Sequence, residues 1–406
     1  MKKSFLLLAA ALLLATAGCK PRYDNYTVII SLDGSRWDYA EMYEMPFFDS
    51  LAAVGVKARM QASYPSSTFP NHYTMATGLV PDHHGLVNNT FWNPETQYTY
   101  SLSDSVARFD RRYYYGEPIW QTAQHQGVKC GVVYWVGSDI DINGEYPTYW
   151  RNWNEQPHWN FDERCDEIVR LLSLPREERP RLVMGYFDEP DHQGHVHGPV
   201  AVETKEAAEH MDSLMHALYL RLKALPEVGK KLNFIVAGDH GMTDISPERF
   251  ISWYDYIPEE WVDRVTGSLP TSIWVKDEAH VDSLYRRLGA VEHLRVWKHG
   301  EVPEYLHYGT SPRLGQLIVL PDLGWQFNFA PSRNNGTHGF DPKETDMMVA
   351  FRAIGPDFKQ GYDAPYTRGE QSSFRNIDLY PMLCELLGID PAPADGRLER
   401  IRKIMK

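Results

Sequence analysis

Four apolar runs, each followed by a short polar stretch with aspartate, constrain the fold of this chain more than any other feature. The runs cover residues 26–32, 128–136, 181–187 and 232–237, and the aspartates that follow them include Asp33, Asp139, Asp191 and Asp239. Continuous apolar runs of this length are typical of strands buried on both faces of a parallel sheet. Because the carboxyl ends of parallel strands share one edge, these aspartates are expected at one rim of the sheet.

Helical patterns lie between the predicted strands. Residues 202–225 and 374–387 carry apolar side chains at helical spacing. Alternating strands and helices predict an α/β fold, doubly wound, with a mostly parallel sheet sandwiched by helices.

The pattern changes between residues 247 and 331. Two shorter strand-like pieces, 271–275 and 315–320, and a helix around 280–288 interrupt the sheet pattern, which resumes near residue 347. We expect a small inserted α/β subdomain at 247–331, flanking a catalytic domain that consists of residues 24–246 and 332–406.

Residues 1–19 have the pattern of a targeting segment. Lys2 and Lys3 precede an apolar run, 5–15, that is too short for a membrane span and suits a signal peptide. The sequence Ala17-Gly18-Cys19 resembles a bacterial lipobox, which would leave Cys19 lipidated, although Thr16 stands where that motif usually has Leu. Ordinary signal-peptidase cleavage after Ala17 is the alternative. We expect an exported bacterial protein, periplasmic or anchored to the outer membrane as a lipoprotein.

Charge and cysteine content exclude several kinds of site. The formal net charge is −13, which disfavours binding to a nucleic-acid duplex. Contact with a membrane is expected only through an N-terminal lipid anchor. Cys130, Cys165 and Cys384 are widely spaced and include no C-x-x-C pair, so neither a disulfide framework nor a thiolate metal site is indicated. Positive charge for a phosphate substrate would therefore come from bound metal.

Carboxylates and imidazoles that follow three of the apolar runs form a candidate metal site together with a histidine of a later loop. The candidate ligands are Asp33, Asp191, His195, Asp239, His240 and His338. A mixed set of carboxylates and imidazoles suits borderline metals better than Mg²⁺ or Ca²⁺, and two zinc ions are the natural expectation. From spacing alone, His192 and His197 are rival ligands, and Asp33-Gly34 could equally be a turn after a strand.

Thr68 stands at a predicted helix start, followed by Phe69 and Pro70. One interpretation is that Thr68 only caps the helix. The other is that its hydroxyl attacks a phosphate bound at the helix N-terminus, where the dipole and free N–H groups favour negative charge. Since a Thr hydroxyl does not ionise unaided near neutral pH, zinc coordination would have to activate it.

The ordered set of motifs closely resembles the nucleotide pyrophosphatase/phosphodiesterase family of the alkaline phosphatase superfamily, as a bacterial member with only the catalytic domain. The matching segments span most of residues 26–350 and are Asp33-Gly34, 68–72, 84–89, 137–139, 189–191, Gly194-His195, Gly198-Pro199, 239–242 and 337–339. The resemblance implies an alkaline-phosphatase-like fold and two Zn²⁺ ions.

The resemblance also implies roles for individual residues. One zinc would be held by Asp191, His195 and His338. The other would be held by Asp33, Asp239 and His240, with Thr68 as the nucleophile beside it. Asn89, rather than Asn88, would donate to a phosphate oxygen.

Aromatic side chains are implied to hold the nucleobase. Phe69 matches an aromatic that stacks on the base in this family, and Trp150 or Tyr149 falls at or near the opposing aromatic. Val136 replaces a Pro that is frequent before Gly137 in the family, which makes the alignment of this loop less secure.

The implied activity is that of a two-zinc phosphodiesterase or nucleotide pyrophosphatase, which cleaves phosphodiester or phosphoanhydride bonds of nucleotides through a phospho-threonine on Thr68. Because Asn89 is neutral and no Arg lies within the motifs, diesters are favoured over monoesters. The alternatives are a choline or lysophospholipid phosphodiesterase, a phosphomonoesterase, and an inactive, zinc-stabilised surface-binding protein.

Overall fold

A mixed but mostly parallel sheet forms the centre of the larger part of the fold. The computed structural model describes residues 24–406, so the predicted signal peptide and Cys19 lie outside the described residues. Within this part the sheet has eight strands in the order β17-β2-β16-β7-β1-β6-β5, and β18 also pairs with β2. The bounds are β1 (Tyr26–Leu32), β2 (Val56–Gln61), β5 (Cys130–Val133), β6 (Leu182–Phe187), β7 (Leu232–Ala237), β16 (Val349–Ile354), β17 (Tyr362–Asp363) and β18 (Phe374–Arg375).

Strand β1 occupies a central position between β6 and β7 and is parallel to both. All seven of its residues are buried, as expected for an apolar strand covered on both faces. Strand β16 runs antiparallel to its neighbours β2 and β7. Because β1, β6 and β7 are parallel, their carboxyl ends lie at one edge of the sheet. Asp33, Asp191 and Asp239 follow these strands at that edge.

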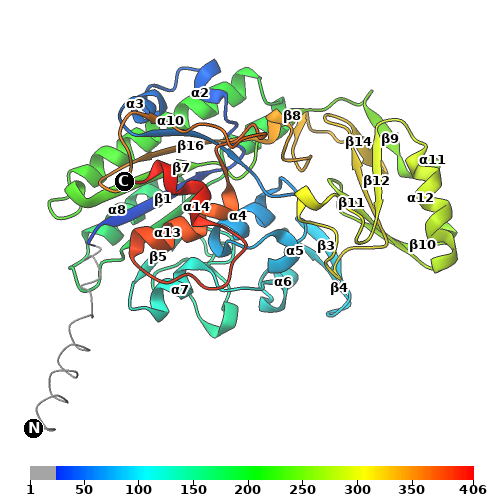
Figure 1. Cartoon of the computed structure of the whole chain (residues 1–406), viewed down its shortest axis with the longest axis horizontal. Coiled ribbons are helices and arrows are strands. Elements are labelled where there is room, and N and C mark those ends of the chain that lie inside the picture. The colour runs from blue at the N-terminus through cyan, green and yellow to red at the C-terminus, as the bar shows by residue number, and fades with distance from the viewer. Residues whose placement is uncertain (1–23) are drawn as a thin grey trace, which may run out of the picture.

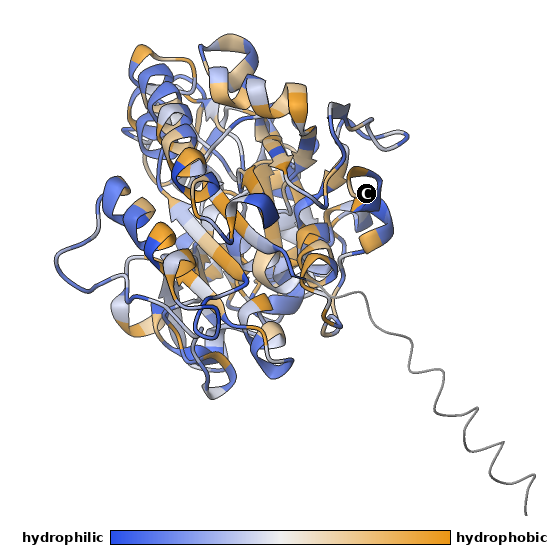
Figure 2. Ribbon diagram, turned by 90° about the vertical axis from the view of Figure 1, so that its left-hand side faces the viewer, coloured by the Kyte–Doolittle hydropathy of each residue, from blue (hydrophilic) through white to orange (hydrophobic). Residues whose placement is uncertain are grey.

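Helices cover both faces of the sheet, which confirms the predicted doubly wound α/β class. Helices α3 (Pro46–Val54), α8 (Phe161–Ser173) and α10 (Val202–Lys223) pack together on one face; α4 (Thr68–Thr77), α7 (Ile119–His125) and α13 (Leu379–Leu387) pack on the other. In Figure 1, α3 and α10 lie above the sheet and α7 and α13 below it. Figure 2 shows hydrophobic residues concentrated in the central strands and on the inner sides of these helices.

Two predicted elements differ from the structure at their ends. The strand predicted at 128–136 is limited to Cys130–Val133, because the chain then turns toward Gly137, which has φ +88°. The helix predicted from residue 374 begins only at Leu379. Phe374 instead pairs with β2 and packs edge-on against Phe351 of β16, so tertiary packing overrides the local helical pattern.

A second, antiparallel sheet lies within the segment between residues 247 and 331. Its strand order is β10-β11-β13-β12, and it has an apolar cluster of its own. The bounds are β9 (Phe250–Ser252), β10 (Val262–Thr266), β11 (Thr271–Val275), α12 (Val281–Gly289), β12 (Leu294–Lys298), β13 (Leu317–Pro321) and β14 (Gln326–Asn328). This unit extends to the right in Figure 1. Val302, Leu306 and Tyr308 pack into the main core, which joins it to the catalytic domain.

The remaining elements are short. They are α2 (Tyr39–Met42), β3 (Thr90–Asn93), β4 (Tyr98–Ser101), α5 (Pro81–His84), α6 (Ser105–Arg108), α9 (Asp191–His197), β8 (Thr243–Asp244), α11 (Trp253–Tyr256), β15 (Gly336–Thr337) and α14 (Leu398–Ile401). Among the helices of residues 24–406, none is both long enough and apolar enough to cross a bilayer.

Candidate active site and metal centre

Two groups of three side chains gather at the carboxyl edge of the sheet. Asp33, Asp239 and His240 form one group, and Asp191, His195 and His338 form the other; within each group the potential ligand atoms lie within 4.8 Å of one another. We call them the Asp33 group and the Asp191 group. The Asp33 group offers two carboxylates and one imidazole, and the Asp191 group offers one carboxylate and two imidazoles. Both are donor sets suited to zinc.

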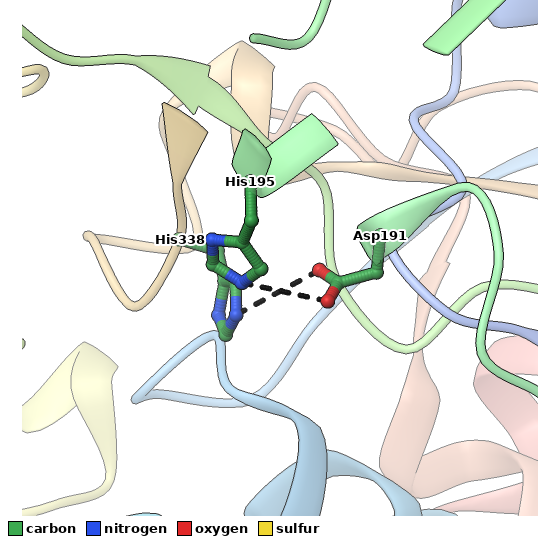
Figure 3. Close-up of side chains that lie close together, drawn as sticks. All are labelled: Asp191, His195 and His338. Carbon is green, nitrogen blue, oxygen red and sulfur yellow. Dashed lines mark ion pairs between the residues drawn. The ribbon is translucent and has the colours of Figure 1, made fainter. Parts of the chain in front are cut away.

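The fold brings each group together from separate elements. Asp33 follows β1 and Asp239 follows β7, and the backbone N–H of Gly34 donates to Asp239 (3.1 Å). Asp191 and His195 stand one helical turn apart on α9, with Asp191 Oδ2 3.4 Å from His195 Nε2. His338 joins them from the loop after β15, with its Nε2 3.8 Å from Asp191 Oδ1. Figure 3 shows both imidazoles directed at the Asp191 carboxylate.

The two groups are direct neighbours. The ring of His240 stacks on that of His338 with centroids 3.6 Å apart, and the N–H of Asp191 donates to the carbonyl of Asp33 (3.0 Å). Gly34 permits this approach, because it has φ +66° and a Cβ there would lie 2.9 Å from Asp191 Cα. Two neighbouring groups of potential ligands therefore share one site.

Each of the three aspartates has one carboxylate oxygen for which the described residues provide no hydrogen-bond partner. These buried atoms are Asp33 Oδ1, Asp191 Oδ1 and Asp239 Oδ2. The other oxygen of Asp33 accepts from the hydroxyl of Tyr186 (2.6 Å). A buried carboxylate oxygen without a partner costs free energy, and metal coordination removes that cost. The residues therefore fit a pair of metal ions.

The three histidines are oriented by the same type of contact. Nδ1 of His195, His240 and His338 lies 2.9 Å from a backbone carbonyl, of Gly336, Gly241 and Ser66 respectively. A carbonyl can only accept, so each Nδ1 carries the proton and each Nε2 presents its lone pair. Such contacts fix the tautomer and the ring orientation of metal-binding histidines.

The electrostatics of the site favour a bound cation. Burial, followed by repulsion from neighbouring carboxylates, raises the pKa of Asp33, Asp191 and Asp239 well above the ordinary value. Burial also lowers the pKa of His240, and it lowers that of His338 to about 3. The imidazoles are thus neutral and able to coordinate, while the carboxylates gain most from a positive charge placed among them.

Thr68 faces the Asp33 group from the start of α4. Its hydroxyl lies 3.1 Å from His240 Nε2. The interpretation of Thr68 as a helix cap is wrong, because Ser67 holds the cap position and Thr68 is the first residue of the helix. Its backbone N–H is therefore one of the free donors of the first turn.

Asn89 is held beside Thr68. The N–H of Phe69 donates to Asn89 Oδ1 (3.0 Å), which leaves the amide NH₂ of Asn89 free to donate into the cleft. The neighbouring Asn88 is turned away, and its NH₂ donates to the carbonyl of Pro270 (3.1 Å). Asn89 therefore faces the site, whereas Asn88 connects its own loop to the inserted segment.

Two cavities open from the metal centre. The first, about 280 Å³, is lined by Asp33, Thr68, Phe69, Asn89, Leu102, Arg108, Tyr134, Val136, Trp153, Tyr186, Asp191, His195 and His338. The second, about 560 Å³, extends toward the inserted segment and shares Asn89, His195 and His338 with the first; Trp253, Arg264 and Phe329 are among its other lining residues. We call them the aromatic cavity and the insertion-side cavity. A substrate reaching both would cross the metal centre.

Residues 27–341 match the family model described as type I phosphodiesterase / nucleotide pyrophosphatase. The chain belongs to this family.

Curated members of the phosphodiesterase family align with nearly the whole chain. Human ectonucleotide pyrophosphatase/phosphodiesterase family member 1 is 32% identical over 396 residues, which cover 94% of this chain and 42% of the human protein. Venom phosphodiesterase 2 of Crotalus adamanteus is 32% identical over 394 residues, 93% of this chain and 47% of the venom protein. The chain therefore spans less than half the length of these relatives.

Solved structures of the family share the fold. Murine ectonucleotide pyrophosphatase/phosphodiesterase 5 superposes with a TM-score of 0.86 and 29% identity, covering 94% of this chain and all of the murine chain. The same values hold for an inactive variant of that murine protein, with threonine replaced by alanine, in complex with AMP.

The aromatic residues singled out from the sequence lie in different places in this family member. Phe69 lines the aromatic cavity, whereas Trp150 and Tyr149 are not among its lining residues. Trp150 is exposed and stacks on Tyr146 (4.2 Å), and the Tyr149 hydroxyl donates to the carbonyl of Glu178 (2.9 Å). Trp153 lines the cavity instead. Trp153 lies in the same aromatic-rich segment, 146–153, and this richness in aromatic residues is what the sequence offers for finding it. The sequence does not show which of these rings faces the site, because that depends on the path of the loop.

Arg108 also lines the aromatic cavity and was not identified from the sequence, since it lies outside the motifs. Its guanidinium lies 5.8 Å from the ring of Phe69 and 5.6 Å from that of Trp153, and it pairs with Asp139 (3.1 Å). Asp139 is the last residue of the Gly137-Ser138-Asp139 motif, and the same oxygen also accepts from the N–H of Trp153 (3.1 Å), so it contacts two residues that line the cavity.

Proposed function

We propose that the chain is a nucleotide phosphodiesterase and pyrophosphatase that uses two zinc ions and Thr68 as the nucleophile. In the first step the Thr68 hydroxyl oxygen bonds to phosphorus and the ester or anhydride oxygen on the opposite side leaves. The intermediate is a nucleotidyl-threonine, and the proton of the Thr68 hydroxyl passes to solvent as the leaving group takes one up. In the second step water attacks the same phosphorus and the bond to Thr68 breaks, which returns a proton to the Thr68 oxygen and releases a nucleoside monophosphate. The observation that carries the proposal is the position of Thr68 at a helix start, facing the Asp33 group and opening onto an aromatic cavity.

The chain's own donors would hold the phosphate. The backbone N–H of Thr68, at the start of α4, and the free NH₂ of Asn89 face the space before Thr68, while the N–H of Phe69 holds Asn89 in place. Fixed donors of this kind are most effective where charge develops in the transition state. Since Asn89 is neutral, it suits the single negative charge of a diester.

The Asp33 group and the Asp191 group would each hold one zinc ion. When bound, these ions supply Lewis-acid stabilisation of the attacking and leaving oxygens in an in-line displacement. The mixed carboxylate and imidazole set and the three unpartnered carboxylate oxygens support this assignment.

The aromatic cavity supports a nucleotide on the retained side of the substrate. Phe69 and Trp153 offer ring faces on which a nucleobase can stack, and Arg108 adds a planar cation within 6 Å of both. The AMP complex of the murine relative supports the same substrate class.

Arg108 also separates this proposal from a choline phosphodiesterase. A quaternary ammonium binds best in an aromatic cage without a competing cation. In the aromatic cavity a choline group would meet the Arg108 guanidinium, while the carboxylates that line the cavity, Asp33 and Asp191, belong to the metal groups. The nucleotide alternative is therefore favoured.

A substrate panel at fixed zinc tests the proposal. We expect rapid hydrolysis of p-nitrophenyl thymidine monophosphate, and much slower release from p-nitrophenyl phosphorylcholine and p-nitrophenyl phosphate. A preference for the choline ester without nucleotide turnover would assign the enzyme to the lipid branch. Faster release from the monoester would make it a phosphatase.

A further inference from the structure

A lysine-lined cavity lies at the edge of the sheet opposite the active site. Its volume is about 620 Å³, and its lining comes from the ends of α3, α10 and β16, the start of β7 and the C-terminal residues. Its lining includes Lys223, Lys230, Lys359 and Lys406. We call it the lysine cavity.

The lysine cavity is positively charged in a protein of net charge −13. Four ammonium groups line it, and none of its lining residues carries a carboxylate side chain. The recorded contacts of these lysines are with neutral groups: Lys223 donates to the carbonyl of Gly229, Lys406 to that of Pro356 (2.8 Å), and Lys359 lies 4.5 Å from the ring of Tyr362. The side chains that line the cavity therefore carry an excess of positive charge, which would attract an anion.

The chain enters the fold beside the same cavity. The amide of Asn25 donates to Asp357 Oδ2 (2.7 Å), which also accepts from Asn233 (2.6 Å), and the N–H of Lys406 donates to the Asp357 carbonyl (2.9 Å). Asp357 is flanked in sequence by the lining residue Pro356 and is close to Lys359. In Figure 1 the C-terminus marks this side of the molecule, and Figure 2 views the molecule from it.

The rim of the cavity combines charge with exposed apolar surface. Val54 is 51% exposed, and Ala53 beside it is also exposed. Lysines that border apolar side chains suit a membrane interface, where the ammonium groups reach phosphate and the apolar atoms meet the acyl boundary. From Cys19 to Asp24 is five residues, which span at most about 18 Å when extended, so lipidation at Cys19 would hold this edge against a bilayer.

We propose that the lysine cavity and its rim bind the phosphate headgroups of anionic phospholipids. The protein would then lie with the starts of β1 and β7 toward the membrane. The metal centre lies at the opposite ends of these strands, so the cleft would open away from the bilayer to soluble nucleotides.

Vesicle sedimentation of the full chain tests the proposal. The measurement is the ratio of affinities for phosphatidylcholine vesicles with and without about 30 mol% phosphatidylglycerol, since each lysine near an anionic surface strengthens binding about fivefold. Comparing this ratio between variants removes the contribution of the N-terminal segment, which all variants share. The test variant is Lys223→Gln/Lys230→Gln/Lys359→Gln, and the charge-matched control is Lys205→Gln/Lys276→Gln/Lys298→Gln, on other faces.

We expect the wild type and the control to prefer the anionic vesicles by at least about tenfold, and the test variant to lose most of that preference. Unchanged thermal unfolding and diester hydrolysis would show that the test variant is folded. Equal ratios for the test variant and the wild type would overturn the proposal. So would calorimetric binding of inorganic phosphate without a vesicle preference, which would identify a site for a soluble anion instead.

Discussion

The hydroxyl of Thr68 lies 3.1 Å from Nε2 of His240, at the first residue of α4. Nδ1 of His240 donates its proton to the Gly241 carbonyl. Nε2 therefore carries a lone pair, which faces the space beside the Thr68 hydroxyl. Asp33 Oδ1 and Asp239 Oδ2 lie 3.3 and 3.2 Å from this nitrogen. A nucleophile and three candidate ligand atoms therefore converge on one position, which connects the metal centre to the chemistry proposed for Thr68.

Histidines of α9 provide a matched test of the Asp191 group. His195→Ala is expected to lower the bound zinc and to reduce diester hydrolysis by orders of magnitude, because one ligand is lost. His192→Ala, an exposed position on the same helix, should leave both unchanged. Metal content by plasma mass spectrometry and turnover of a nucleotide diester measure the effect. Equal zinc content in the two variants would contradict the assignment of His195.

Chelation should abolish turnover, and added zinc should restore it better than magnesium does. The reason is the imidazole nitrogen in both groups, which suits zinc and not Mg²⁺. Titration of the metal-free protein with each ion, followed by activity, is the measurement. Full recovery with magnesium alone would contradict a zinc centre.

Asn89→Ala is expected to lower kcat by about 10²–10³-fold with a smaller change in KM, since a fixed donor acts mainly on transition-state charge. Asn88→Ala should instead act on stability, because its side chain joins the active-site loop to Pro270. Steady-state kinetics and thermal unfolding of both variants separate these effects. A purely structural role for Asn89 would appear as a lowered melting temperature without a loss in kcat.

Trp153→Ala should raise KM for a nucleotide diester by about tenfold or more, because base stacking contributes about 1–3 kcal/mol. Trp150→Ala is the control, since Trp150 stacks on Tyr146 and is absent from the lining of the aromatic cavity. A substrate without a base, bis(p-nitrophenyl) phosphate, should be less sensitive to Trp153→Ala. If Trp150→Ala instead carried the larger effect, the base would lie outside the cavity.

Sequence reasoning reached the fold class and most of the candidate ligands because these depend on local patterns, whereas the division of the ligands into two groups came from the family resemblance. Buried strands end shortly before Asp33 and Asp239, and the spacing of Asp191 and His195 matches one helical turn. The structure gathers the same six residues that the family resemblance assigned to metal.

The substrate cavity was less predictable because it depends on tertiary contacts. Arg108 reaches the site from a short helix and is held by Asp139, which lies 31 residues further along the chain. Whether Trp150 or Trp153 faces the cavity depends on the path of an irregular loop, for which no periodicity exists. Phe374 shows the same limit in the fold, since its pairing with β2 replaces the first turn of the expected helix.

The central claim is that Thr68 becomes covalently phosphorylated during turnover. Its most direct test is rapid acid quenching of the enzyme with a nucleotide diester, followed by peptide mass spectrometry. We predict a nucleotidyl adduct on Thr68 in the wild type, that is, a nucleoside monophosphate esterified to the Thr68 oxygen. In Thr68→Ala the adduct should be absent and kcat should fall by several orders of magnitude, while zinc content stays near that of the wild type. An adduct on another residue, or a Thr68→Ala variant with normal activity, would contradict the account.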